Sequence, residues 1–474
     1  QPACGPGPVR GSDAAPSDCG FFPGVGTSGI YTSSDGGHTW TNRGLLDDQT
    51  SWASAGVISD GDPVMTYGPK PDGHGGFSFA HGARAYYASL ATITGAKGYE
   101  YIIVSHSDDN GLTWSAPVIG TTKTSAADFN DKNWISVDAN PDSRYFGQAY
   151  LTWTEFRSAT FTGYGNEPVM VAVSKDGGQS FGAPTQLSPA GNNLTGNGRQ
   201  GSTSVSGPDG TVYVAFEQGF NQVVTVSRDG GHRWTRPMVI GAVTDIANPI
   251  PGASFRTDSF PTLAADPLPG STTVYAAWSN ATADGGRIVV AKSTDRGAHW
   301  STPVQVSGSE GYAFFQGLAT APDGRLYLAY QALVAKDTST FGTGNAAIST
   351  YAATSTDGVT WTTPVKVSSV ASDPAASAQN NLQLQFWGDY NTLVAGSTGA
   401  WFIYTDSRTG VGCPAVDAYQ NYLVDNGLVN IAEAEDVDSP ADPSAPVAKP
   451  APEDVCPSQF GNTDVVVSGL TLAP

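Results

Sequence analysis

The chain has few charged residues, little positive charge and no long hydrophobic run. Only 14% of its 474 residues are charged, and 43 acidic residues against 23 basic ones give a formal net charge of −20. Such acidity repels both the phosphate backbone of nucleic acid and negatively charged membrane surfaces. No run of eighteen apolar residues is present, so no membrane-spanning helix is predicted. We therefore expect a soluble monomer that contacts neither nucleic acid nor membrane.

Cysteine is also scarce, and its four copies fall in two local pairs. Four cysteines allow three connectivities, and pairing neighbours gives Cys4 with Cys19 and Cys413 with Cys456. No Cys-x-x-Cys spacing points to a metal site instead. Disulfides indicate an oxidising compartment, so we expect a secreted, extracellular protein that begins, after processing, at Gln1.

Two common chemical motifs are missing as well. The sequence has no P-loop and no His-Glu-x-x-His, so phosphate-binding and zincin functions lack support. We expect no required cofactor. A single structural Ca²⁺, bound by Asp carboxylates and carbonyls, stays open as an alternative, although a solvated acidic surface explains the charge more simply.

Glycine and proline, by contrast, are abundant, with 57 and 32 copies. Together with many Ser and Thr residues they favour short strands joined by tight turns over long helices. An all-β class follows. A search for internal repeats then finds one motif, Ser-x-Asp-x-Gly-x-x-Trp or a close variant, which we call the box. Its six copies, the last one residue short, span residues 33–40, 107–114, 174–181, 227–234, 293–300 and 355–361.

The box has a clear structural reading. Its Asp can accept hydrogen bonds from the amides of its own turn, its Gly can take positive φ, and its aromatic residue can pack between sheets. Repetition in every unit favours this structural role over catalysis. Between boxes a weaker repeat predicts inner strands that begin near Asp62, Trp134, Ser202, Phe260, Phe315 and Trp387.

Six boxes and six inner strands predict a six-bladed β-propeller of four-stranded antiparallel blades. Because too little sequence precedes the first box, the two ends should share a blade, with residues 29–44 as its outer strands. Seven blades are the alternative, since the strand-like residues 464–470 are left over. We expect a disulfide-tied segment over residues 1–28 and one propeller domain over residues 29–474, with a surface insertion at about 411–460.

Candidate site residues lie where inner strands begin and second strands end, because both open on the face opposite the boxes. Carboxylates, arginines and a tyrosine gather there, as a glycan or carboxylate site requires. The alternative is a purely structural role, in which these charged residues form ion pairs that cap the strands. The candidates are Asp62, Lys132, Trp134, Glu155, Arg157, Arg199, Gln200, Glu217, Arg256, Asp258, Gln316, Gln331, Trp387, Asp389, Tyr390, Asp406 and Arg408.

The boxes and the blade pattern resemble those of the Asp-box, or bacterial neuraminidase repeat, β-propeller superfamily, which includes the sialidases. The resemblance implies Tyr390 with Glu217 as a nucleophile pair and Asp62 as acid/base. It implies an arginine triad for a substrate carboxylate, formed by Arg199, Arg256 and Arg408, and we add Trp134 and Trp387 as substrate-binding residues. The chain departs from sialidases in lacking an Arg-Ile-Pro motif before the first box, where Arg10 is the only arginine.

Fold alone does not decide function. We expect a secreted, glycan-active enzyme, a sialidase-like glycoside hydrolase that acts on a carbohydrate at the mouth of the central channel, with an acidic sugar as one candidate substrate. Two alternatives stay open at this point. One is a propeller that binds a glycan or a protein without catalysis, and the other is a polysaccharide lyase.

Overall fold

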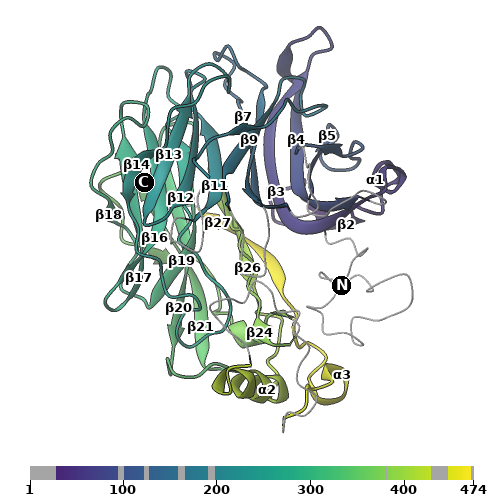
Figure 1. Cartoon of the computed structure of the whole chain (residues 1–474), viewed down its shortest axis with the longest axis vertical. Helices are drawn as coiled ribbons and strands as arrows, with labels where there is room; N and C mark the ends of the chain where they lie inside the picture. The colour runs from purple at the N-terminus through teal and green to yellow at the C-terminus, as the bar shows by residue number, and fades with distance from the viewer. Residues whose placement is uncertain are drawn as a thin grey trace.

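The computed structural model describes residues 28–93, 101–121, 128–157, 166–190, 198–380, 382–428 and 447–470 (Figure 1). Strands dominate this part of the chain, as the abundance of Gly, Pro, Ser and Thr predicts. The helices are short: α1 (Thr50–Ala55), α2 (Pro414–Asp425), α3 (Pro452–Val455) and the 3₁₀ turn η3 (Pro374–Ala376). None of the helices described is long and apolar enough to span a bilayer.

Three separate four-stranded antiparallel sheets follow one another along the chain. In each sheet the strands lie in chain order, from a long inner strand to a very short or edge strand. The first holds β3 (Val57–Pro71), β4 (Phe77–Ile93), β5 (Tyr101–Ser107) and β6 (Val118–Ile119). The second holds β7 (Phe129–Val137), β8 (Ala149–Phe156), β9 (Val169–Ser174) and β10 (Thr185–Gln186). The third holds β11 (Arg199–Ser206), β12 (Val212–Gln218), β13 (Asn221–Ser227) and β14 (Met238–Ala242).

The next eight strands form one continuous sheet. Its first half comprises β15 (Thr262–Ala265), β16 (Val274–Thr282), β17 (Gly285–Ser293) and β18 (Val304–Gln305). Its second half comprises β19 (Tyr312–Thr320), β20 (Leu326–Ala335), β21 (Ala346–Ser355) and β22 (Val365–Lys366). The halves are antiparallel internally, and β17 meets β19 through one parallel pair, Gly286 with Tyr312.

Three smaller sheets complete the fold. One has three strands, β25 (Thr392–Gly396), β26 (Gly399–Asp406) and β27 (Asp464–Leu470). The others are the pairs β1 (Gly29–Thr32) with β2 (Thr41–Leu45) and β23 (Gln379–Asn380) with β24 (Leu384–Gln385). The chain is therefore an all-β protein with a β-propeller arrangement (Figure 1).

The sheets correct the predicted blade count. Neither six nor seven separate four-stranded blades are found in the part of the chain that the structure describes, because β15–β22 join into one sheet and the C-terminal sheet has three strands. The prediction that the two ends of the chain share a blade is also wrong in which strands are hydrogen-bonded. Residues 464–470 pair along β26, where residues 29–44 were expected. Strands β1 and β2 pair with each other, and Ile30 packs against the cluster around Trp52 and Tyr87.

The core lies between neighbouring sheets. One cluster joins Tyr86 and Val104 of the first sheet to Leu151 and Trp153 of the second. Equivalent clusters join the second sheet to the third, the third to the eight-stranded sheet, and the eight-stranded sheet to β25–β27. Burial on both faces explains why second strands such as β8 and β12 are mostly buried.

The box turns form as predicted from their residue types. In the fourth box, Ser227 Oγ accepts a hydrogen bond from the Gly231 amide at 2.9 Å, and Asp229 accepts one from the Arg233 amide at 2.8 Å. The sixth box, which is one residue shorter, keeps the bond to its serine: the Gly358 amide donates to Ser355 Oγ. The first box connects β1 to β2, whereas each of the other five follows the third strand of a four-stranded sheet or of one half of the eight-stranded sheet. Antiparallel order therefore places these five boxes at the end opposite the start of the inner strand.

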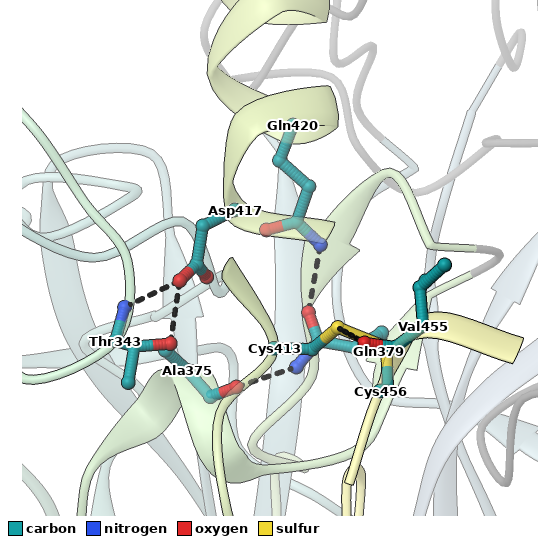
Figure 2. The surroundings of a disulfide bond; sticks show 8 residues. All are labelled: Thr343, Ala375, Gln379, Cys413, Asp417, Gln420, Val455 and Cys456. Atoms are coloured by element: carbon teal, nitrogen blue, oxygen red, sulfur yellow. Dashed lines mark hydrogen bonds between the residues drawn. A yellow bond between two sulfur atoms is a disulfide. The ribbon is translucent and has the colours of Figure 1, made fainter. Parts of the chain in front are cut away.

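A disulfide joins Cys413, at the start of α2, to Cys456, at the end of α3 (Figure 2). This bond confirms one of the two predicted pairs, whereas Cys4 and Cys19 lie outside the described residues. Helix α2 is also held by side chains: Gln420 donates to Gln379 at 2.7 Å, and Asp417 accepts from the Thr343 amide at 2.8 Å.

Candidate active site

Four inner strands contain a β-bulge near their start. The pairing register shifts beside Asp62 in β3, Lys132 in β7, Gly201 in β11 and Phe315 in β19. Their φ angles are 53°, 52°, 69° and 49°, in the left-handed region that non-glycine residues seldom adopt. Bulges re-aim side chains and occur often beside active sites. We call this end of the inner strands the mouth.

Glycine occupies the bulge of β11 for a steric reason. A Cβ atom at Gly201 would lie 2.1 Å from the ring of Phe260. The Phe260 ring therefore fills the place that a side chain takes in the other three bulges.

A half-open pocket lies at the mouth. Aromatic rings and charged groups share its wall, as in many ligand sites. The lining residues are Lys132, Trp134, Gly201, Ser202, Thr203, Asp258, Phe260, Pro261, Thr262, Phe315, Gln316, Asp389, Tyr390 and Asn391.

Tyr390 and Asp62 form the first polar pair of the site. The Tyr390 hydroxyl donates a 2.7 Å hydrogen bond to Asp62 Oδ2. Burial raises the pKa of the Asp62 carboxyl to about 7; the charges of Asp131 and Asp389 add to this shift, while Lys132 and the hydrogen bond oppose it. Burial and the charge of Asp62 raise the pKa of Tyr390 well above its usual value. Asp62 can therefore hold or release a proton near neutral pH, as a general acid must.

Asp389 is the centre of a buried ion-pair network. Its Oδ2 lies 3.1 Å from Lys132 Nζ and 2.5 Å from Arg256 Nη2, and its Oδ1 accepts from Arg256 Nε at 3.2 Å. Burial opposes ionisation of Asp389, but the two cations outweigh it and lower the pKa of this carboxyl. Lys132 Nζ also lies 4.9 Å from the centre of the Tyr390 ring, so the network supports the Tyr390–Asp62 pair.

Glu217 lies in a second acidic group, with Asp245 and Asp258. One carboxylate oxygen of each lies within 4.8 Å of those of the other two. Burial raises the pKa of Glu217 to about 9, with further contributions from the charges of Asp258 and Asp245. Gln222 donates to Glu217 at 3.1 Å. Carboxylate oxygens are the ligands that Ca²⁺ prefers, and the structural Ca²⁺ considered from the sequence stays a prediction.

The predicted nucleophile pair is not formed. The Tyr390 hydroxyl donates its one hydrogen bond to Asp62 and not to Glu217. A carboxyl group with a pKa of about 9 keeps its proton at neutral pH and cannot act there as a base. Asp62 therefore takes the position beside Tyr390 that Glu217 was predicted to hold.

The three predicted arginines face three different carboxylates. Arg256 pairs with Asp389, whereas Arg408 pairs with Asp406 at 2.8 Å. Arg199 is buried, and Glu167 accepts a 3.2 Å hydrogen bond from its backbone amide. The structure thus does not assemble the triad, and only Arg256 reaches the network at the pocket.

The two tryptophans predicted to bind substrate lie in different environments. Trp134 is half-buried and lines the pocket, as its predicted role requires. Trp387 is 2% exposed, stacks near Phe255 at 5.8 Å and donates to Gln331 at 2.9 Å, which places it in the core instead. A buried ring cannot contact a ligand, so this placement corrects the substrate-binding prediction for Trp387.

Several site residues received no role from the sequence. Three of them, Lys132, Asp258 and Asp389, were candidates only because they lie at the starts of inner strands. Nothing in the sequence showed which of these charged groups would pair. Asp131 precedes Lys132 in the same bulge, where its Oδ2 accepts from Gln200 at 3.0 Å. Asp245 follows an outer strand, whereas the candidates from the sequence came only from the starts of inner strands and the ends of second strands. A search for polar residues beside every irregular strand start would have found Asp131.

Comparison with known proteins finds a likeness to one family of repeat domains over the middle of the chain. Residues 102–336 match the BNR repeat-like domain family, which confirms the predicted resemblance to Asp-box propellers over that part. No curated protein matches the chain.

Solved structures with a similar fold are distant in sequence. A mutant NanB sialidase from Streptococcus pneumoniae superposes with a TM-score of 0.44 and 10% identity, over 75% of this chain and 66% of that one. An ulvan lyase gives a TM-score of 0.40 and 12% identity, over 68% and 74%. The α-L-arabinofuranosidase from Podospora anserina gives 0.33 and 13%, over 58% and 83%. The chain thus spans about two thirds of the NanB sialidase.

Proposed function

We propose that this protein is a glycan-active enzyme that cleaves a glycosidic bond in the pocket at the mouth. The observation that carries the proposal is the state of Asp62. This carboxyl has a pKa raised to about 7, accepts a hydrogen bond from buried Tyr390 and lies beside a pocket with aromatic walls. Carboxyl groups tuned in this way serve as proton donors to a leaving-group oxygen.

The roles follow from how the carboxyl groups differ. Glycoside hydrolysis needs one protonated and one ionised carboxyl group on either side of the scissile bond. In our proposal Asp62 is the acid and Asp258, which lines the pocket, is the second carboxyl group, which stabilises positive charge or activates water. Tyr390 orients Asp62 through its hydrogen bond and keeps its own proton. Asp389 is the fixed counter-charge for Lys132 and Arg256.

The charge balance favours a neutral sugar over an acidic one. The two cations nearest the pocket, Lys132 and Arg256, already share Asp389. A substrate carboxylate would have to compete with this buried partner, and it would meet Asp258 as well. Aromatic walls, by contrast, suit the apolar faces of a neutral sugar ring. A lyase acting on uronates would need a free cation, so hydrolysis is the better supported reaction.

A substrate screen with matched variants tests the proposal. Wild type should release sugar from at least one neutral aryl glycoside or oligosaccharide. Asp62→Asn should lower kcat by about 10²- to 10⁴-fold, the usual contribution of a general acid. Asp60→Asn is the control, because Asp60 lies on the same strand and also has a raised pKa, but its hydrogen bond comes from Thr92, whereas the Tyr390 hydroxyl donates to Asp62. Equal rates for wild type and Asp62→Asn would reject the assignment.

We also propose that the protein works outside the cell. The Cys413–Cys456 disulfide supports this location, because such bonds persist in oxidising compartments. Detection of the disulfide by mass spectrometry in protein taken from the culture medium, with none of the chain left in the cell, is the direct check.

A further inference from the structure

Phe315 has a backbone conformation that its side chain disfavours. Its φ is 49°, and a bulky residue in the left-handed region is a genuine outlier. Glycine takes the same place in the bulge of β11, at Gly201. The fold therefore accepts glycine at a bulge of this type, so the phenylalanine in β19 is not required by the backbone.

The surrounding side chains hold this conformation in place. Asn391 donates to the Phe315 carbonyl at 3.3 Å. The next residue, Gln316, is 7% exposed and donates to the Phe260 carbonyl at 2.8 Å and to Thr262 Oγ1 at 3.0 Å. Strained residues persist when their surroundings over-determine them, and they gather at ligand sites.

The ring of Phe315 is fixed but incompletely covered. It packs edge-on against Phe314, with 5.0 Å between ring centres, while the residue remains half-buried and lines the pocket. Asn391, which holds its carbonyl, is the chain neighbour of Tyr390. The structure thus presents a rigid aromatic surface in the pocket that is also lined by Tyr390, the hydrogen-bond partner of Asp62. A rigid surface of this kind binds a ligand without losing conformational entropy of its own.

We propose that Phe315 is a specificity-determining residue whose ring is the platform for a neutral sugar ring of the substrate. The proposal rests on the glycan-cleaving function above and adds the class of group bound at this subsite. Phe315 touches substrate without taking part in bond cleavage. Its loss should therefore change substrate binding far more than it changes the chemical step.

Phe315→Gly is the direct test, because glycine relieves the left-handed strain and removes the platform. With a neutral oligosaccharide, KM should rise about ten- to a hundredfold, the range expected for losing a buried aromatic contact. The kcat should change by less than about threefold and the Tm should not fall. Phe315→Tyr, which keeps the ring, should restore KM to near wild type. Asn110→Gly is the control, since Asn110 has φ of 63° in an exposed box turn.

Two results would overturn the inference. One is an unchanged KM in Phe315→Gly. The other is a fall in Tm in Phe315→Gly together with a loss of kcat, which would make the ring purely structural. If wild type cleaves no glycan, the proposed function fails by itself. Calorimetric titration with the same oligosaccharides then decides on Phe315: weaker binding by Phe315→Gly supports the platform, and equal binding rejects it.

Discussion

The Tyr390 hydroxyl donates a hydrogen bond to the Asp62 carboxylate across 328 positions of the chain. The bond connects the loop before β25 with the bulge of β3, so it links the last inner strand to the first. It also joins a carboxyl group with a pKa near neutrality to a phenol of the pocket lining that stays protonated. The first prediction concerns this pair.

Tyr390→Phe should shift the pH dependence of kcat/KM to higher pH. The hydrogen bond from Tyr390 lowers the pKa of Asp62, so its removal raises that pKa above about 7. A general acid must be protonated, and the alkaline limb of the profile therefore follows the pKa of Asp62 upward. Rates measured between pH 5 and 9 test this shift. The surface variant Tyr31→Phe should leave the limb in place, and a downward shift in Tyr390→Phe would contradict the roles assigned.

Glu217 should make the protein less stable as the pH rises. Its pKa is raised from 4.5 to about 9, so the native state binds this proton more tightly than the unfolded chain does. The resulting stabilisation is complete below pH 4.5 and is lost as the pH rises through about 9. Urea unfolding across this range should show a falling free energy in wild type.

Two variants isolate the effect of Glu217. Glu217→Gln should flatten the decline, because an amide has no proton to lose. Asp258→Asn should weaken it, because the charge of Asp258 contributes to the raised pKa of Glu217. The interpretation is wrong if Glu217→Gln declines as steeply as wild type.

The sequence predicted the class of fold better than it predicted the pairing of charges. Box turns follow from local residue types, since Ser, Asp and Gly bond within one turn, and these turns formed. Blade boundaries depend on contacts between distant strands, so the pairing of β27 with β26 was missed. At the mouth, strand ends correctly gathered Asp62 and Tyr390. The carboxylate that an arginine contacts depends on the direction of its side chain. The spacing of Arg199, Arg256 and Arg408 in the sequence does not reveal that direction.

The box turns should matter for stability and not for catalysis. Ser227→Ala removes a fully buried acceptor for the Gly231 amide, which should cost about 1–3 kcal/mol. Because the boxes lie at the opposite end from the mouth, kcat should be unchanged. Ser33→Ala is a matched control: the same bond to Gly37 lies near exposed residues, so water can replace it and the loss should be smaller. Equal losses in the two variants would show that burial is not the cause.

The Cys413–Cys456 disulfide should stabilise the C-terminal region without affecting catalysis. It closes a sequence separation of 43 residues, for which loop entropy predicts about 4 kcal/mol. The double variant Cys413→Ser, Cys456→Ser should therefore unfold at a lower temperature than wild type. Its kcat at 25 °C should match wild type, because α2 stays attached through the Gln420–Gln379 and Asp417–Thr343 hydrogen bonds (Figure 2). Calorimetry with and without reductant completes the test. Reductant should lower the Tm of wild type by more than that of the variant, and an equal response would show that this bond contributes nothing to stability.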